Sequence, residues 1–311
     1  MVELLESVHW SIAIRDVPRT QVRVGAAGEV DDAGGMPTAL FRMNAYDQLR
    51  TASIGKLFLL AELMRQVRFG DIALDDVIDR DDERPDDPME DSGLLYMLAQ
   101  RTWQVKDLAV LVGAFSDNYA TNLLVERVGL ANVQRCAREV LGYRTSNLLD
   151  KVRWERPKFS DLPNDMSCGC AEELCDYMAR LSDGSLIDAQ ASAGIERWLG
   201  ADADTSMVAG AFDLDPLAHW PDDAGFRLRH KTGTESDVRG DVGFVTDETT
   251  SRTVAYAVLA NWDKERYGDV RDEVLSRMRT LGTLIREYLQ TGDVTIFDRS
   301  AAGLVDGRNR G

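Results

Sequence analysis

The sequence predicts a mixed α/β fold of the α+β kind, with an antiparallel sheet flanked by terminal helices and an inserted all-α lobe. Strand-like segments occur near the start of the chain and again after His230. Helical segments fill the middle of the chain, and one more follows the last strand-like segment. Runs of strands separated by a run of helices are typical of an α+β architecture. The order therefore predicts that both ends of the chain build one α/β lobe around a helical lobe.

The predicted strands are short β-branched runs in which apolar and polar residues alternate, as expected for strands with one exposed face. Near the start of the chain, these runs are residues 8–17, 21–24 and 41–43. After His230, residues 241–247 and 252–262 have the same texture and flank a polar turn at 248–251. Two such runs joined by a short polar turn predict an antiparallel hairpin.

The segment from Ser53 to Phe69 has apolar residues at helical spacing and stops at Gly70, which predicts an amphipathic, largely buried helix. Further segments with this spacing end near a glycine or a polar cluster. They are residues 106–115, 118–129, 132–142, 171–181 and 270–289. The connection from Thr145 to Gly169 has no clear periodicity, and loops of that length in compact domains are usually functional or disordered.

These elements predict a single domain over residues 1–311. Residues 1–50 and 215–298 are expected to form the α/β lobe and residues 51–214 the mostly helical lobe, with 299–311 as a flexible tail. The chain is 44% hydrophobic and 29% charged, and 311 residues of this composition can bury a large core.

The charge balance argues against two kinds of partner. Asp and Glu outnumber Lys and Arg by 53 to 36, for a formal net charge of −17. An acidic protein repels phosphate backbones and anionic lipids, so neither nucleic acid nor a membrane is expected as a partner. The acidic run from Asp75 to Asp91 is interpreted as a solvated loop. The longest apolar run, residues 57–61, is far shorter than the roughly 20 residues that span a bilayer.

Residues 1–17 carry acids where a secretory signal has a basic start, and they lack its apolar centre and cleavage site. A cytoplasmic protein is therefore expected, or an exported one if a signal segment has been removed. Three of the four cysteines lie in one short stretch, which predicts reduced, mostly buried thiols. The cysteines are Cys136, Cys168, Cys170 and Cys175. The three histidines do not have metal-ligand spacing, so no metal or other cofactor is expected.

Ser53 and Lys56 form a Ser-x-x-Lys motif at the start of the first predicted helix. Side chains three positions apart share a helix face, so the Lys56 ammonium can reach the Ser53 hydroxyl. In this interpretation Ser53 is a nucleophile and Lys56 can activate it. The motif alone also fits a helix N-terminus with a capping serine and a solvated lysine.

A second motif, Ser116-Asp117-Asn118, opens another predicted helix. The Ser116 hydroxyl could relay a proton, and the Asn118 amide could hold a substrate carbonyl. The alternative interpretation is again a helix cap.

The third motif, residues 231–234 with the sequence Lys-Thr-Gly-Thr, runs into the predicted strand hairpin. Glycine in such a strand lets the backbone come close to a ligand, while the lysine and the hydroxyls face an anionic group. The spacing of the three motifs leaves room for the helical lobe between nucleophile and binding strand. Three weak motifs in this order form a strong joint signal.

Together, the three motifs resemble the Ser-x-x-Lys, Ser-Asp-Asn and Lys-Thr-Gly set of the serine β-lactamase and penicillin-binding protein superfamily. The resemblance is closest to class A β-lactamases and spans nearly the whole chain, including the continuation through residues 235–243. It implies a β-lactamase-like fold and a hydrolase that opens a β-lactam through an acyl-enzyme on Ser53, followed by water-mediated deacylation. Antibiotic resistance would be its biological consequence.

The resemblance also implies roles for individual residues. The backbone N–H groups of Ser53 and Thr234 would form the oxyanion hole, and Ser116 would pass a proton to the departing nitrogen. Burial beside Lys231 would lower the pKa of Lys56, so that its amine can act as the base for Ser53. Glu155 acting through a water molecule is the alternative base for this step. The residues implied for substrate binding are Asn118, Thr232, Gly233, Thr234 and Arg239.

Class A enzymes also need a glutamate on an Ω-shaped loop, which drives water onto the acyl-enzyme. Arg153-Trp154-Glu155 resembles the start of that loop and makes Glu155 the candidate base. The asparagine expected four residues later is Phe159 in this chain, and an exposed loop glutamate is the alternative interpretation. The implied catalytic residues are Ser53, Lys56, Ser116, Glu155 and Lys231.

Three functions remain open at this point. The first is a β-lactamase-like hydrolase, the second a cytoplasmic esterase or peptidase on the same scaffold, and the third a slowly deacylating penicillin-binding or sensor protein. In each case the partner is a small-molecule β-lactam or an acyl ester or amide, and the protein is expected to be a monomer or a weak homodimer. The rate of deacylation distinguishes a hydrolase, which releases the acyl group quickly, from a penicillin-binding or sensor protein, which retains it.

Overall fold

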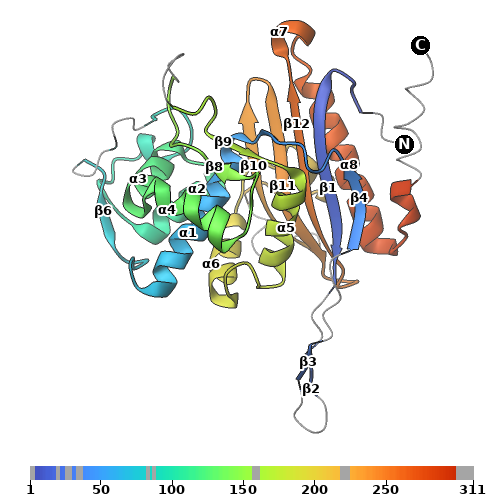
Figure 1. The fold of residues 1–311 in the computed structure, drawn as a ribbon, viewed down its shortest axis with the longest axis horizontal. Helices are drawn as coiled ribbons and strands as arrows, with labels where there is room; N and C mark the ends of the chain where they lie inside the picture. Colours follow the sequence, from blue (N-terminus) through green and yellow to red (C-terminus); the bar gives the residue numbers. More distant parts are fainter. Residues whose placement is uncertain are drawn as a thin grey trace.

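The computed structural model describes residues 4–18, 22–24, 30–32, 38–81, 85, 89–155, 162–217 and 225–298 (Figure 1). The predicted tail at 299–311 and the position of Phe159 lie outside the described residues. Among the residues that are described, no helix has both the length and the apolar composition needed to cross a membrane.

A five-stranded antiparallel sheet has the strand order β10-β11-β12-β1-β4. Its strands are β1 (Val8–Val17), β4 (Thr38–Met43), β10 (Phe226–Glu235), β11 (Val238–Asp247) and β12 (Thr253–Trp262). β1 pairs with β12 along its whole length, from Val8 opposite Trp262 to Val17 opposite Thr253. Segments from both ends of the chain therefore build one sheet, with β10 and β4 at its edges (Figure 1).

Different helices cover the two faces of this sheet. α5 (Ala171–Ser182) packs on the face that joins the core of the helical part. α8 (Arg271–Thr291) covers the other face together with η4, a 3-10 helix at Val208–Phe212. Every residue of β11 is buried, because this strand is covered on both faces.

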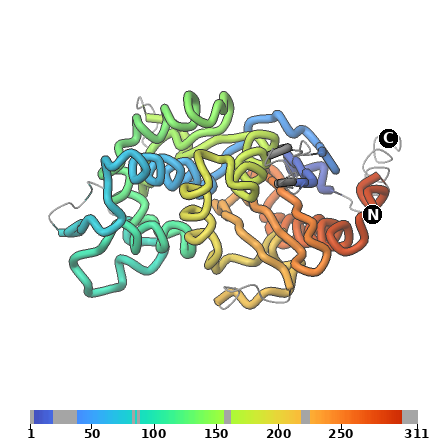
Figure 2. The backbone as a smooth tube through the Cα atoms, turned by 90° about the horizontal axis from the view of Figure 1, so that it is seen from below, coloured from blue at the N-terminus to red at the C-terminus, as the bar shows by residue number. Residues whose placement is uncertain are grey.

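The helical part lies beside the edge strand β10, as Figures 1 and 2 show. Its central helix is α1 (Lys56–Phe69), in which residues 56–64 are all buried. α1 ends at Gly70, whose φ of 80° lies in the left-handed region that glycine adopts freely. The helices around it are α2 (Val105–Phe115), α3 (Asn118–Val128), α4 (Leu130–Arg135) and α6 (Ala189–Leu199). A short helix, α7 (Lys264–Tyr267), connects β12 to α8.

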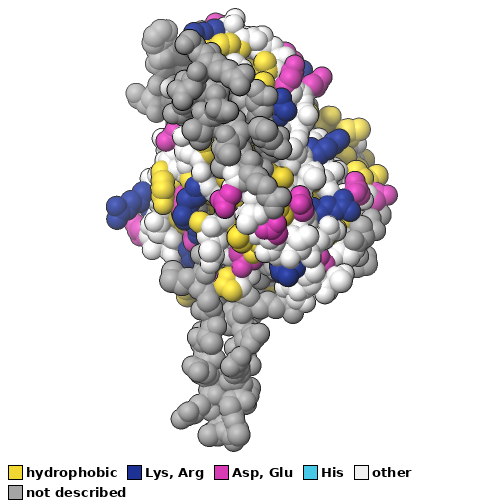
Figure 3. Space-filling view, turned by 90° about the vertical axis from the view of Figure 1, so that its right-hand side faces the viewer, with side chains coloured by type: hydrophobic (Ala, Val, Ile, Leu, Met, Phe, Trp, Pro, Cys, Tyr) yellow, Lys and Arg dark blue, Asp and Glu magenta, His cyan; other side chains and the backbone are white. Residues whose placement is uncertain are grey.

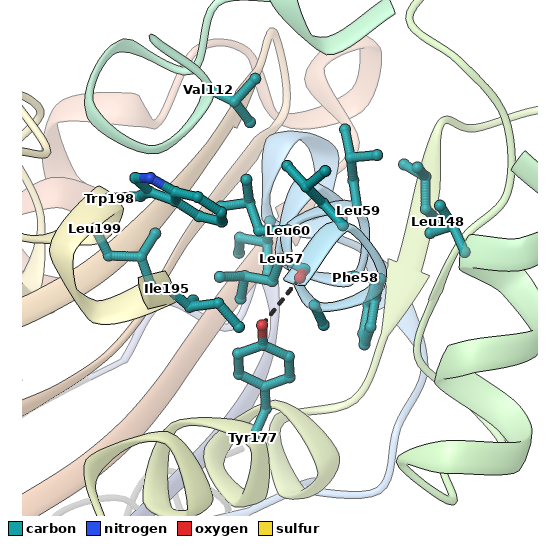
Figure 4. Packing of buried hydrophobic residues seen from close by; sticks show 14 of the residues in the cluster. Leu57, Phe58, Leu59, Leu60, Val112, Leu148, Tyr177, Ile195, Trp198 and Leu199 are labelled. Atoms are coloured by element: carbon teal, nitrogen blue, oxygen red, sulfur yellow. Dashed lines mark hydrogen bonds between the residues drawn. The ribbon is translucent and has the colours of Figure 1, made fainter. Parts of the chain in front are cut away.

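Figure 4 shows how α1 is packed. Residues 57–60 lie among Tyr177 of α5 and Ile195 and Trp198 of α6, all of them buried. The Tyr177 hydroxyl donates a hydrogen bond to the Leu57 carbonyl oxygen at 2.9 Å. This contact fixes the start of α1, which immediately follows the turn that carries Ser53.

Three elements differ from the sequence prediction. Ser53 is not part of α1 but lies on η1, a 3-10 turn at Ala52–Gly55. The helix predicted at 132–142 is α4 followed by a π-helical turn at Cys136–Val140. α6 was not predicted, although its buried residues Ala191, Ile195 and Trp198 recur at helical spacing.

The connection between Thr145 and Gly169 is partly regular, although the sequence shows no periodicity there. It contains β8 (Asn147–Leu148) and β9 (Ser167–Gly169), and β9 also pairs with β5 (Leu49–Arg50). β5 directly precedes the Ser53 turn, so this small sheet helps to place it. The remaining elements are β2 (Val22–Val24), β3 (Val30–Asp32), β6 (Val77–Asp79), β7 (Thr102–Gln104) and η2 (Leu95–Met97).

Charged side chains of both signs share the surface. On the face seen in Figure 3, acidic and basic side chains are interspersed. Many acidic groups are paired elsewhere too, such as Asp188 with Arg68 at 2.7 Å and Asp79 with Arg101 at 2.6 Å. The excess of acidic residues is therefore not gathered into one patch on the face shown.

Replacing Tyr177 with Phe removes the hydroxyl that binds the Leu57 carbonyl and keeps the packed ring. We expect the free energy of unfolding to fall by about 1 kcal/mol, the usual net value of one hydrogen bond. Urea denaturation followed by circular dichroism measures this change. Tyr267→Phe is the matched control, because Tyr267 is 42% exposed. Equal losses in both variants would contradict the proposed importance of the Tyr177 contact.

Candidate active site

Ser53 lies on the turn η1 between β5 and α1. Ser167 of β9 holds this turn, because its Oγ donates to the Ala52 carbonyl oxygen at 2.5 Å and lies 2.7 Å from Thr51 Oγ1. Ala52 has a φ of 48°, a left-handed conformation that costs about 1 to 3 kcal/mol when a side chain is present. Such strain persists only where surrounding contacts hold the backbone, so tertiary structure sets the position of the half-buried Ser53.

Lys56 joins the first two motifs. Its side chain is fully buried, and its Nζ donates to the Ser116 carbonyl oxygen at 2.5 Å and to Asn118 Oδ1 at 2.7 Å. A third bond, to Ser116 Oγ, measures 3.2 Å. An ammonium has three donors, and these acceptors use all of them. In the part of the chain that the structure describes, Lys56 therefore makes no hydrogen bond to Ser53 Oγ, although the sequence predicted that it could reach this hydroxyl.

Burial is the main cause that lowers the pKa of Lys56 well below its ordinary value, and the positive charge of Lys231 lowers it further. The carboxylates of Asp117 and Asp91 act in the opposite direction. The pKa of Lys231 is also lowered by burial, against the opposing charge of Asp202. The folded chain thus has the burial and the like charge that the sequence argument for a neutral Lys56 requires.

Asp117 supplies the helix cap of the second motif. Its Oδ1 accepts from the Ala120 N–H at the start of α3 at 2.8 Å, and its Oδ2 accepts from the N–H groups of residues 94–95 at 2.7 Å each. Ser116 ends α2 in a left-handed conformation with a φ of 52°. Because Asp117 makes the cap, polar groups of Ser116 and Asn118 are available to Lys56.

Gly233 brings the third motif against the turn that carries Ser53. A Cβ atom at this position would lie 2.2 Å from the Thr51 carbonyl oxygen and 3.1 Å from Ile54 Cγ1. At Gly240 of β11, a Cβ atom would lie 2.6 Å from Ile54 Cδ1. Only glycine allows strands to approach this closely. The sequence predicted such an approach for Gly233 toward a ligand, and the structure shows it toward η1.

The other predicted binding residues lie at the same end of β10 and β11. Lys231 is fully buried and its Nζ donates to the Thr232 carbonyl oxygen at 3.0 Å. Thr234 is exposed and pairs with Arg239 across the two strands. Arg239 is largely buried, and its Nη1 donates to the carbonyl oxygens of Glu235 at 2.5 Å and Val238 at 2.7 Å. Two buried cationic side chains therefore flank the contact at Gly233.

His230 belongs to a buried polar cluster that sequence reasoning missed. Its Nδ1 lies 3.1 Å from Asp241 Oδ1, which also accepts from the Tyr256 hydroxyl at 3.1 Å. Burial alone would lower the pKa of His230, but the charges of Asp241 and Asp202 outweigh it and raise this pKa to about 9. Gly243 leaves space for the His230 side chain, since a Cβ atom at Gly243 would lie 2.6 Å from His230 Cβ. The available signal was Asp241, an acid that directly precedes the apolar run of residues 242–245 in β11.

Glu155 is exposed, and the structure joins it by no hydrogen bond or ion pair to another described residue. The chain just before it is fixed, because the buried Asn122 amide binds both the N–H and the carbonyl oxygen of Val152 at 2.9 Å. The described contacts of Ser53 and Lys56 do not include the Glu155 carboxylate. Its role as the deacylating base therefore stays a prediction.

Asp91 is a neighbour of the site that no motif contains. Its Oδ1 accepts from Asn118 Nδ2 at 3.0 Å, while Asn118 Oδ1 accepts from Lys56. Asp91 is exposed, as the interpretation of residues 75–91 as a solvated loop expects, but that interpretation is wrong at Val77–Asp79, which form β6 with a buried Ile78. Only folding brings this carboxylate to the second motif, so the sequence held no signal for it beyond the acidic run.

Solved structures of β-lactamases share this fold. A β-lactamase from Sphaerobacter thermophilus DSM 20745 is 24% identical, with 89% of this chain and 91% of that chain covered and a TM-score of 0.67. PBP-A is 16% identical over 93% of this chain and 92% of its own, with a TM-score of 0.67. A class A β-lactamase from Mycobacterium abscessus is 14% identical over 91% and 94%, with a TM-score of 0.63. A search of curated proteins finds no match.

These likenesses confirm the predicted α/β fold with its antiparallel sheet and helical lobe. The fold and the three motifs together define a member of the serine β-lactamase and penicillin-binding protein superfamily. Residues 34–289 match the pattern of the β-lactamase enzyme family, and the chain belongs to that family. The protein is a serine β-lactamase-like hydrolase that acts on a small molecule.

The His230 cluster predicts a pH dependence of stability. Because the folded-state pKa of His230 is raised from 6.5 to about 9, its stabilisation is fully present below the unfolded pKa and is lost as the pH rises through about 9. Across this window we expect wild type to lose about 3 kcal/mol more unfolding free energy than His230→Gln. Denaturant titrations at several pH values measure the difference between the two proteins.

His9→Gln is the control for this comparison, since the His9 side chain is 52% exposed. It should keep the pH dependence of the wild type. Identical slopes for wild type and His230→Gln would show that His230 is not charged in the folded protein.

Proposed function

We propose that the protein opens a β-lactam ring in the manner of class A β-lactamases, through an acyl-enzyme on Ser53. The observation that carries this proposal is the buried Lys56, which is bonded to Ser116 and Asn118 of the second motif and follows directly on the Ser53 turn. Strand β10 with the third motif packs against the same turn. Nucleophile, relay and binding strand thus converge from distant parts of the chain.

In the acylation step, the neutral amine of Lys56 accepts the proton of the Ser53 hydroxyl while Oγ attacks the carbonyl carbon. The bond from this carbon to the ring nitrogen then breaks, and Ser116 Oγ passes its own proton to the nitrogen while it takes up the proton that Lys56 received from Ser53. The lowered pKa of Lys56 supports the first transfer, and its 3.2 Å contact with Ser116 Oγ supports the second.

The substrate would be held by the third motif. Lys231, Thr232, Thr234 and Arg239 would surround its carboxylate, with Gly233 giving the close approach, and Asn118 would bind its amide carbonyl. The backbone N–H groups of Ser53 and Thr234 would stabilise the oxyanion, a contribution of about 3 to 4 kcal/mol per donor in comparable sites. The buried positive groups at this end of β10 support recognition of an anion.

A slowly deacylating penicillin-binding protein is the second candidate. It is favoured by Glu155, which is exposed and makes no contact with Ser53 among the described residues. A mutant of PBP-A, a structural neighbour, is known as an acyl-enzyme complex with penicillin G. An esterase or peptidase on the same scaffold is the third outcome that an experiment must separate.

We propose a reducing compartment such as the cytoplasm as the site of action. The four cysteines are free thiols, and Cys136, Cys170 and Cys175 are buried. Burial raises the pKa of Cys136 and of Cys175 to about 12, which keeps both thiols protonated and unreactive. Resistance to β-lactams would follow only if turnover is rapid.

Replacing Ser53 with Ala should abolish all covalent chemistry with a chromogenic β-lactam. Colour and intact mass are followed together in wild type. Repeated turnover supports the hydrolase, a persistent adduct of one acyl group supports the penicillin-binding protein, and cleavage of esters without colour supports the third function. Ser236→Ala, which removes an exposed hydroxyl, is the control and should behave as wild type. Activity that persists in Ser53→Ala would disprove the nucleophile.

Replacing Glu155 with Gln separates the two steps of the reaction. If Glu155 activates the deacylating water, the variant should accumulate acyl-enzyme and lose roughly 10²-fold or more in deacylation rate, with a smaller effect on acylation. Quenched samples analysed by mass spectrometry give both rates. Glu139→Gln, at another exposed glutamate, is the control. An unchanged adduct lifetime would remove Glu155 from the mechanism.

A further inference from the structure

The backbone of Arg50 in β5 is bound by a side chain of β12. Asn261 Oδ1 accepts from the Arg50 N–H at 3.0 Å, and Asn261 Nδ2 donates to the Arg50 carbonyl oxygen at 3.1 Å. One amide side chain thus contacts both backbone polar groups of Arg50, as a neighbouring strand would. Because Arg50 lies three residues before Ser53, these two bonds fix the chain where it enters the Ser53 turn.

The Arg50 side chain is bound to the turn between β10 and β11. Its Nη2 donates to Asp237 Oδ2 at 2.7 Å and its Nη1 donates to Asp237 Oδ1 at 3.1 Å, so the guanidinium and the carboxylate share two parallel bonds. The Glu235 carboxylate lies 3.8 Å from the Arg50 Nη1. The Asp237 backbone is also fixed, since its carbonyl oxygen accepts from the Trp262 N–H at 3.1 Å. Both partners of the ion pair are therefore anchored to β12.

The ion pair joins the two segments that supply the proposed oxyanion hole. Arg50 precedes Ser53 by three residues, and Asp237 follows Thr234 by three residues. The gap between the N–H groups of Ser53 and Thr234 depends on how β10 lies against the Ser53 turn. The close contact at Gly233 limits how near the strand can come to that turn. The ion pair opposes the reverse movement, so the two interactions together set the gap.

We infer that Arg50 and Asp237 are positioning residues that hold the N–H groups of Ser53 and Thr234 at the separation that the oxyanion requires. Their side chains bind each other and act on the reaction only through the backbone. The oxyanion develops in the transition state of acylation and is absent from the bound, intact β-lactam. Loss of the ion pair should therefore slow acylation without weakening substrate binding. This inference rests on the proposed function, because it assumes acylation of Ser53.

Acylation by benzylpenicillin tests this inference. Intact mass after rapid quenching, measured over a range of penicillin concentrations, gives the limiting first-order rate of acylation and the concentration at half that rate. Arg50→Gln and Asp237→Asn each remove the ion pair and keep a polar side chain. We expect the limiting rate to fall by about tenfold in each variant, because a small displacement of catalytic groups can cost up to about 10²-fold. The concentration at half the limiting rate should stay within about twofold of wild type.

Three further variants separate positioning from general stability. The double variant Arg50→Gln with Asp237→Asn should lose no more rate than either single variant, because both changes remove the same interaction. Arg50→Lys keeps the charge but cannot form two parallel bonds, so its rate should lie between those of wild type and Arg50→Gln. Arg68→Gln is the matched control, since it breaks the 2.7 Å ion pair with Asp188 in the last turn of α1 and should leave the limiting rate unchanged.

Circular dichroism first shows that each variant is folded, and Arg50→Lys takes the place of Arg50→Gln if the latter is not. Limiting rates within about twofold of wild type in the variants of both residues would overturn the inference while leaving acylation of Ser53 intact. Losses that multiply in the double variant would also overturn it, because the two residues would then act independently. An equal fall in Arg68→Gln would do the same, since the effect would then reflect stability. Absence of any adduct in wild type would instead overturn the proposed function, and the inference with it.

Discussion

The buried amino group of Lys56 is the group on which the site depends. Removing such a group from water is costly unless each donor finds an acceptor, and here the acceptors come from Ser116 and Asn118 at the junction of α2 and α3. The bonds therefore tie α1 to α2 and α3 at the point where the Ser53 turn ends. Burial also lowers the pKa of Lys56, so the interaction that holds the site together also prepares its chemistry.

Strained backbone residues and a close strand contact surround the Lys56 amino group. Ala52 and Ser116 both have left-handed backbones, and each lies at the end of an element that other segments hold in place. Gly233 presses β10 against the same turn at a distance that no side chain would permit. Strained residues cluster at functional sites because the surrounding fold compensates their cost. The large buried core of the helical part provides that compensation here.

The site contains buried positive groups, although the chain as a whole is acidic. Two buried lysines, Lys56 and Lys231, lie close enough for Lys231 to lower the pKa of Lys56. Two carboxylates act here: the buried Asp202 opposes the lowering of the Lys231 pKa, and the exposed Asp91 accepts a hydrogen bond from Asn118. Buried positive groups thus lie at β10 and an exposed carboxylate lies at the loop of Asp91, so the charge differs between the two sides of the proposed site.

Much of the fold was predictable, because in long segments with clear periodicity the spacing of apolar residues shows which face is buried. β1 and α8 lie within two residues of their predicted bounds, and the hairpin of β11 and β12 turns where the sequence indicated. α6 was missed although Ala191, Ile195 and Trp198 recur at helical spacing in its sequence. The helix predicted from Ser53 begins only at Lys56, since Ser167 holds the preceding turn in a 3-10 conformation.

The sequence by itself determined which residue types carry the chemistry, because Ser-x-x-Lys, Ser-Asp-Asn and Lys-Thr-Gly are local patterns whose order along the chain is informative. Only the tertiary structure decided what each of them contacts. Lys56 binds Ser116 and Asn118 and makes no hydrogen bond to Ser53 among the described residues, and Asp91 joins the site from a loop that carries no motif. The physical reason is that hydrogen bonds and charge interactions depend on distances in space, which segments remote in sequence acquire only when the core between them has packed.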